Sequence, residues 1–406
     1  YSLESLEGAI QAIYVLQIFQ FPLINFANMA QTFIGKHLGA GEPKDVGPCI
    51  WQMGWISLLS TVLIVPLGML AGSLFFKGTI GESSANIYFN LLLGSNFLFP
   101  LCAAFSSFYL AQGLTKFIIR TTFIAYGLNL VLDLILIFGI SHVVPPLGIL
   151  GAALSIVISR LLFCTILFVY FLKRPCRETY RTDQWKIDFS KIGHYIRICT
   201  PRAIGRTLAL LAWALTSHFM AIKGGDYLLV LSIGGTVVLF CYFFADSLIQ
   251  ALTLIFSRCI GAKQYQKMWK SWRAGLLLVG IVNGGLSIPF LFFPDFILSF
   301  FFAQLPTESL MEYLRLSLYW IWGWVLLNSL AGLFLPFLLA VQDTFFYMTV
   351  MFLTVLTSAV PIYFFINRLN WAPDKFWLIL VVEHFIILCL YSSRVYWLQR
   401  TRDFGA

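Results

Sequence analysis

Four polar residues share one face of an otherwise apolar segment, and one of them is a carboxylate. They follow one another at steps of four, three and four, as residues on one stripe of a helix do, and are Thr122, Tyr126, Asn129 and Asp133. An ionisable group among Leu, Ile and Val costs several kcal/mol unless it is paired, hydrated or bound to an ion. Asp133 therefore predicts a functional site, and we expect the stripe to face protein or water, not lipid.

The composition defines the class of protein. Of 406 residues, 59% are hydrophobic and 11% are charged, and the mean hydropathy is +0.84. Apolar stretches long enough to cross a bilayer recur along the whole chain, so we predict an all-α polytopic membrane protein without a separate soluble domain. Eleven spans are expected, at about 8–34, 49–75, 85–112, 117–140, 147–172, 190–222, 226–257, 272–302, 310–341, 344–366 and 375–398.

The net charge of +9 reflects topology, not a nucleic-acid partner. Eighteen Lys and Arg residues lie in alternate loops and the tail, against four in the opposite loops, so the first set is predicted to be cytoplasmic. The eight cysteines lie mostly in apolar segments without a C-x-x-C pair, which argues against a disulfide framework or a zinc site. The chain begins at Tyr1 without a signal-peptide pattern.

Two sequence repeats divide the chain into halves. Residues 36–40 align with 258–262, and residues 110–115 align with 339–344. The offset spans an even number of helices, so both halves should enter the membrane with the same orientation. We predict an N-terminal lobe at 1–172, a cytoplasmic loop at 173–189 and a C-terminal lobe at 190–406. The first half shows one span fewer, which predicts a further helix before Tyr1.

Several short motifs together resemble those of the multidrug and toxic compound extrusion (MATE) transporters over essentially the whole chain. They are the glycine-rich 35–41, Asn129-x-x-x-Asp133 running into 137–139, the segment 147–155, and 259–262. The resemblance, with the DinF-like branch favoured, implies twelve helices in two six-helix lobes. It also implies export of amphipathic, often cationic compounds, driven by inward Na⁺ or H⁺.

The same resemblance implies roles for individual residues. Asn129 and Asp133 match a pair that helps build the cation or proton site of the first lobe, and no other metal site is expected. Ser155 and Ser106 have hydroxyl oxygens suited to a hard cation, whereas Tyr126 and Thr122 are accessory groups or helix–helix contacts.

The second lobe lacks a carboxylate where the repeat predicts one. The positions that correspond to Asn129 and Asp133 are Ser358 and Ile362, so ion coupling is expected in the first lobe alone. Glu383 and His384 are either a second proton relay or a structural pair.

Arg202 and Asp246 are predicted to form a structural charge pair in the second lobe. Each lies about 18 Å deep in one of two consecutive antiparallel helices, and unpaired charges are costly there. Arg206, one turn further, is the reserve partner. Arg202 and Arg206 also keep open an alternative function, a lipid-linked oligosaccharide flippase of the same superfamily.

No catalytic motif of a membrane-embedded enzyme is found within the spans, so the chain is not expected to be an enzyme. We expect no tightly bound cofactor beyond the coupling ion, Na⁺ or H⁺. The expected partners are small-molecule substrates and membrane lipid, and the protein is expected to function as a monomer. The predicted location is the plasma (bacterial inner) membrane, with multiple passes.

Overall fold

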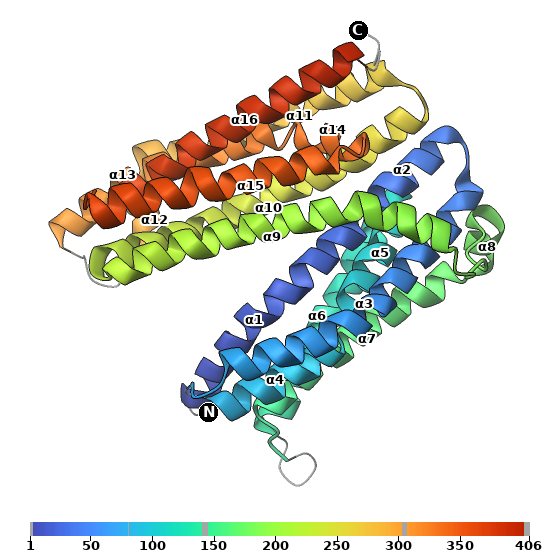
Figure 1. Ribbon diagram of the computed structural model, residues 1–406, viewed down its shortest axis with the longest axis horizontal. Coiled ribbons are helices and arrows are strands. Elements are labelled where there is room, and N and C mark those ends of the chain that lie inside the picture. The colour runs from blue at the N-terminus through green and yellow to red at the C-terminus, as the bar shows by residue number, and fades with distance from the viewer. Residues whose placement is uncertain (1–2, 80, 140–144, 303–306, 402–406) are drawn as a thin grey trace. The chain divides into compact units, whose positions relative to one another are not determined.

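The chain folds into helices that divide into two compact units. The computed structural model describes residues 3–79, 81–139, 145–302 and 307–401, and within these ranges it contains no β-strand. The units are Tyr1–Ala203 and Ile204–Ala406. Figure 1 follows the helices from blue at the N-terminus to red at the C-terminus.

The first unit contains the helices up to the first part of α9. In chain order they are α1 (Leu3–Asn28), α2 (Ala30–Ala40), the short 3₁₀ helix η1 (Pro43–Asp45), α3 (Val46–Phe75), α4 (Glu82–Gly94), α5 (Leu98–Ala111), α6 (Thr115–Phe138), α7 (Ile149–Phe171), α8 (Arg174–Tyr180) and α9 (Phe189–Lys223). The predicted lobe boundary at 173–189 lies before α9, whereas the two units meet within this helix.

The second unit begins within α9 and continues to the end of the described chain. Its further elements are α10 (Gly225–Gly261), α11 (Tyr265–Ser287), the π-helix η2 (Ile288–Phe292), α12 (Pro294–Ser299), α13 (Glu308–Ala331), α14 (Leu335–Ala340), α15 (Thr344–Pro361), the π-helix η3 (Ile362–Arg368) and α16 (Lys375–Thr401). The predicted span 272–302 differs most from the structure. It starts earlier, at Tyr265, and its regular helix ends near Pro289 and Pro294, because proline cannot donate the backbone hydrogen bond that a helix requires.

Most of these helices are long and apolar enough to cross a bilayer. Nine qualify within the described residues, or ten if α4 and α5, which are bent by 43°, form one span. The remaining predicted span, 190–222, is the continuous 35-residue helix α9. It is less apolar than the others because it contains Arg197, Arg202 and Arg206. The count of eleven is therefore approximate.

The two sequence repeats adopt the same local structure. The first ends α2 and α10 with residues of positive φ, Gly41 and Lys263, and the next backbone N–H in each case bonds five residues back, at 2.9 and 2.8 Å. The second repeat does the same after α5 and α14, at Gly113 and Gln342, with bonds of 3.0 and 2.9 Å. These are six-to-one helix C-caps, which satisfy free carbonyl groups. The matching caps support an internal repeat of the backbone.

The loop 173–189 packs against α3 in the first unit. The indole of Trp51 donates to the Thr182 carbonyl at 2.7 Å, and that of Trp55 donates to the Trp185 carbonyl at 2.8 Å. A Cβ on Gly47 would lie 2.3 Å from the Tyr180 carbonyl oxygen, so only glycine allows the loop to approach this closely. The basic loop is thus a fixed part of the first unit.

Candidate functional site

Asp133 lies near the C-terminal end of α6. About 27 Å of helix separates it from Thr115, the first residue of α6, and the helix ends at Phe138, roughly 8 Å beyond it at about 1.5 Å per residue. The side chain is half-buried. The carboxylate is therefore deep with respect to the predicted cytoplasmic side and still partly accessible.

A hydroxyl of the next helix connects the two predicted coupling residues. Ser155 of α7 is fully buried, and its Oγ donates to Asp133 Oδ1. The same oxygen accepts a hydrogen bond from Asn129 Nδ2 at 3.2 Å and lies 2.9 Å from the Ala152 carbonyl oxygen. Asn129 and Asp133, which were predicted as a pair, thus form one cluster with Ser155, which was predicted as an accessory residue, across α6 and α7.

Glycines set the distance between these two helices. A Cβ on Gly151, one turn before Ser155, would lie 2.4 Å from the Leu136 carbonyl oxygen of α6. The chain entering α7 also bonds to the end of α6, through Leu147 N to Leu136 O at 2.9 Å. Gly148 has a φ of +61°, a conformation that side chains disfavour. The segment 147–155 therefore holds Ser155 against Asp133.

The groups of the cluster present oxygen atoms to a cation, and the hydroxyl proton of Ser155 can change its hydrogen-bond acceptor. A serine hydroxyl donates a single hydrogen bond, so Ser155 can donate to Asp133 or to the Ala152 carbonyl, but not to both. A charged carboxylate is the stronger acceptor. Once Asp133 is neutralised, Ser155 can turn to Ala152. Carboxylate, hydroxyl, amide and backbone carbonyl oxygens are the donors that hard cations prefer.

The structure adds two residues that the sequence analysis did not identify. The Ala152 carbonyl is a backbone group, and no side-chain pattern reveals it. Tyr88 of α4 is buried in the same hydrophobic cluster as Ala153, two residues before Ser155 on α7. Its only sequence signal is a tyrosine within an apolar span.

Three predicted accessory residues lie outside this hydrogen-bonded cluster in the described structure. Tyr126 is 61% exposed, so its part of the stripe is not covered by protein. Thr122 is half-buried on α6, and Ser106 is half-buried on α5. Their accessory role stays a prediction.

Asp246 belongs to a second polar cluster, on α10. Its Oδ2 accepts a hydrogen bond from Gln250 Nε2 at 2.7 Å, and its Oδ1 lies 3.5 Å from the Tyr242 hydroxyl. Arg206 lies over the ring of the same tyrosine, with 5.3 Å from Cζ to the centroid. Within the second unit the reserve partner, Arg206, and Asp246 therefore share Tyr242 as a neighbour. The pair Arg202–Asp246 stays a prediction.

The positions equivalent to Asn129 and Asp133 are apolar or already satisfied. Ser358 is buried and donates to the Thr354 carbonyl of its own helix at 2.7 Å, and Ile362 is fully buried. The described part of this region thus has no counterpart of the Asp133 cluster.

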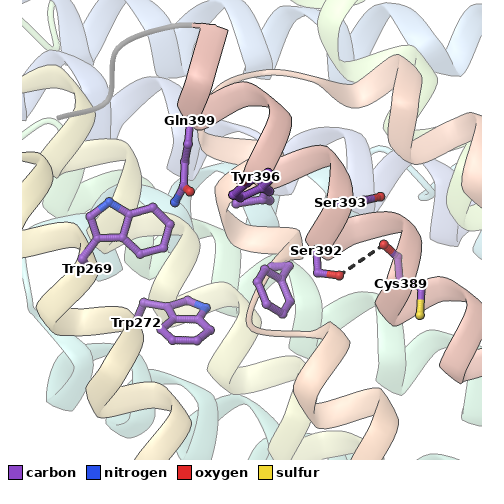
Figure 2. Close-up of a pocket in the computed structure, with 9 residues that line it drawn as sticks. Trp269, Trp272, Cys389, Ser392, Ser393, Tyr396 and Gln399 are labelled. Carbon is purple, nitrogen blue, oxygen red and sulfur yellow. Dashed lines mark hydrogen bonds between the residues drawn. The ribbon is translucent and has the colours of Figure 1, made fainter. Parts of the chain in front are cut away.

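A groove of about 540 Å³ lies at the predicted cytoplasmic end of the second unit. Figure 2 shows the indoles of Trp269 and Trp272, from α11, across from Tyr396 and Gln399 of α16. Ser392 donates to the Cys389 carbonyl at 3.2 Å, the bond drawn in the figure. Four of its nine lining residues are aromatic, and the lining belongs to different helices from the Asp133 cluster.

The fold and the cluster define the class: a polytopic α-helical membrane protein with an ionisable oxygen cluster within its spans. The chain belongs to the MatE family, whose sequence profile matches residues 1–135 and 201–364. It is thus an integral, multi-pass membrane protein of a transporter family, and its bacterial relatives indicate the plasma membrane.

Curated relatives and a solved structure agree with this assignment. The chain is 25% identical over 303 residues to the probable multidrug resistance protein NorM of Thermotoga maritima, covering 73% of this chain and 64% of that protein, less than two thirds of its length. It is also 25% identical to the probable multidrug resistance protein YoeA of Bacillus subtilis, covering 75% and 67% of the two chains. An outward-facing multidrug resistance MATE transporter of the MOP superfamily matches with a TM-score of 0.84 at 15% identity, covering 98% and 90%. The last comparison concerns the fold alone.

Proposed function

We propose that this protein is a secondary active antiporter that exports amphipathic, often cationic organic compounds in exchange for Na⁺ or H⁺ by alternating access. The two lobes of this transporter are the N-terminal and C-terminal halves. The observation that carries the proposal is the Asp133–Ser155–Asn129 cluster, because a partly accessible carboxylate with a buried hydroxyl partner can bind and release a cation reversibly.

The cluster supports coupling through two arrangements of its hydrogen bonds. While Asp133 is charged, Ser155 donates to it and α7 is tied to α6 at this depth. When a proton or Na⁺ neutralises Asp133, Ser155 can donate to Ala152 instead, and the tie between the helices changes. An ion moves a conformational equilibrium only if it binds the two conformations with different affinity, and this change of bonds between helices is a source of such a difference.

The ligands for Na⁺ would be the oxygens of Asp133, Ser155 and Ala152, with the Asn129 amide turned to present its oxygen. A proton would instead bind Asp133 alone. Both ions neutralise the same carboxylate, so they compete, and the coupling ion is decided by their relative affinity.

Transport in proteoliposomes tests the proposal. The purified protein is reconstituted, and ethidium movement is followed by fluorescence with a Na⁺ gradient at equal pH, and separately with a pH gradient without Na⁺. We expect at least one gradient to drive ethidium against its concentration and collapse of that gradient to stop the movement. Absence of driven movement under both gradients, for protein that is folded and binds ethidium, would contradict antiport.

The flippase alternative has less support from the arginines of the second unit. Binding a pyrophosphate group needs cationic side chains that are available to it. Arg206 lies on the Tyr242 ring and near Asp246, which together compensate its charge.

A further inference from the structure

A second carboxylate is buried in the second unit, on α16, away from the cluster around Asp246. Glu383 is 2% exposed. The other well-buried acids of this unit each have a basic partner: Asp374 lies 3.0 Å from Lys375 Nζ, and Asp343 lies 2.8 Å from Arg394 Nε. Among the described residues, the basic partner of Glu383 is His384, whose Nδ1 lies 3.4 Å from its Oε2. A carboxylate so placed is stable when protonated or beside an imidazolium.

Glu383 occupies the position on α16 that Ser155 occupies on α7. The buried stripe of α7 contains Gly151, Ser155, Ser159, Phe163 and Leu167. The buried stripe of α16 matches it at one constant offset, with Ile379, Glu383, Ile387, Tyr391 and Val395. The residue opposite the coupling carboxylate in the first unit is therefore itself a carboxylate in the second.

The two carboxylates also lie at the same depth. Asp133 is about 27 Å from the first residue of α6, and Glu383 is about 27 Å from Thr401, the last residue of α16, at about 1.5 Å per residue. Both of these helix ends are predicted to be cytoplasmic.

His384 connects the buried acid to a less buried position. Its side chain is 15% exposed, compared with 3% for that of Glu383. Its Nδ1 lies 3.1 Å from the Leu380 carbonyl oxygen, so Nδ1 carries the proton, and that proton faces Glu383 as well. The ring lies 4.8 Å from the Trp324 ring of α13, whose buried indole N–H has no hydrogen-bond partner within the described structure. An indole with an unused donor thus lies beside the imidazole.

Within the described residues, no charged side chain from the elements packed against α16 forms an ion pair with Glu383. These elements are α13, α14, α15 and η3. Besides Glu383 and His384, their titratable or charged residues, with those of α16 itself, are Glu308, Glu312, Tyr313, Arg315, Tyr319, Tyr347, Tyr363, Arg368, Lys375, Cys389, Tyr391, Arg394, Tyr396 and Arg400. Within the described residues, the only ion-pair contact of Glu383 is with His384.

We propose that Glu383 is a second proton-carrying site of the transporter, and that His384 passes the proton to and from it. A proton arrives at Nε2 of neutral His384 and forms the imidazolium. The Nδ1 proton then moves to Glu383 Oε2, leaving a neutral carboxylic acid and a neutral imidazole that keeps its proton on Nε2. Release follows the same steps in reverse. The site rests on the proposed antiport, and we assign it to protons because the partner of Glu383 within the described residues is an imidazole nitrogen, which carries a proton and is not a ligand for Na⁺.

Proton counting upon ligand binding tests the inference. Purified protein in weakly buffered, Na⁺-free solution is titrated with ethidium, and the protons released per bound ethidium are measured for wild type, Asp133→Asn, Glu383→Gln and the double variant. We expect each single change to remove part of the release, up to about one proton, and the double variant to release none. Ser317→Ala is the matched control, because Ser317 is a buried polar residue of the same unit that bonds only to its own helix. It should release as many protons as wild type.

A second measurement keeps the test informative if Glu383→Gln does not fold. The Asp133→Asn variant, which keeps Glu383, is examined by pH-difference infrared spectroscopy for a buried carboxylic acid that titrates. We expect one such signal, and His384→Asn should shift its titration. If Asp133→Asn shows no titrating buried acid, or if it already abolishes all proton release, the second site is wrong. If wild type releases protons but transports nothing under either gradient, the antiport proposal fails while the titration of Glu383 stands.

Discussion

The two units repeat the same helix caps but place their polar groups on different helices. In the first unit, α6 and α7 meet at Asp133 and Ser155, and the carboxylate is half-buried. In the second unit, α15 leads into Ile362 at the position of Asp133, and the acids lie instead on α10 and α16, as Asp246 and Glu383. A repeated backbone therefore does not imply repeated chemistry, because caps depend on backbone geometry whereas an ion site depends on a few side chains.

Among the variants that test this comparison, the neutralisation of Asp133 should have the largest effect, which is on transport. Asp133→Asn keeps the shape of the side chain and an acceptor for Ser155, but it removes the charge. We expect gradient-driven ethidium export to be lost, with folded yield and membrane insertion unchanged, as measured by proteoliposome transport and by size-exclusion chromatography. Asp226→Asn, a carboxylate-to-amide change in the first turn of α10, should transport normally. Wild-type export by Asp133→Asn would contradict the proposal that the first unit couples transport to an ion through Asp133.

Neutralising Asp246 should instead affect stability. Asp246→Asn removes the charge from the group that accepts a hydrogen bond from Gln250 and that shares Tyr242 with Arg206, so it should lower the free energy of unfolding by about 2 kcal/mol and reduce folded yield. Adding Arg206→Gln should restore part of this loss, and by more than adding Arg202→Gln does. Thermal unfolding in detergent measures all of these variants. Equal rescue by Arg202→Gln would support the pair predicted from depth alone, and no rescue by either would return Asp246 to the candidate proton carriers.

The contact between α6 and α7 can be changed without altering any polar group. A methyl group at Gly151 would lie 2.4 Å from a backbone oxygen of α6, so Gly151→Ala should force the helices apart and destabilise the protein by about 2 kcal/mol. Gly127→Ala on α6 is the matched control, because a Cβ there meets nothing within 4 Å. This control should be neutral or stabilising by about 0.5 kcal/mol. Thermal unfolding of both variants checks the pair, and equal stability would contradict the close approach.

The sequence was sufficient for the fold class and the family, whereas the coupling role of Asn129 and Asp133 stays a prediction. Polar spacing on one apolar segment identified Asn129 and Asp133, and motif order identified the family. The contact of both with Ser155 could not be derived from spacing, because it depends on how closely α7 packs against α6, which Gly151 decides. Depth along a helix suggested Arg202 for Asp246, and that pair stays a prediction; depth does not give the rotation about the helix axis, so it could not show that Arg206 lies over Tyr242.

The smallest predicted effect comes from removing the hydroxyl of Ser155 while a small side chain stays buried at that position. Ser155→Ala removes a hydrogen bond to a charged group, worth about 1.5 kcal/mol, so the apparent affinity for the coupling ion should change by roughly tenfold. The direction of this change in affinity distinguishes Na⁺ from a proton. Na⁺ loses an oxygen ligand and should bind more weakly, whereas a proton should bind more tightly, because the charged carboxylate has lost a donor that stabilised it.

Ser159→Ala is the control, since Ser159 lies one turn further on the same buried stripe and its Oγ has no partner within the described residues. Ion-dependence curves of ethidium export give both affinities. If Ser155→Ala behaves as Ser159→Ala does, the hydroxyl is a packing residue, and the coupling site of the first unit reduces to Asp133 and Asn129.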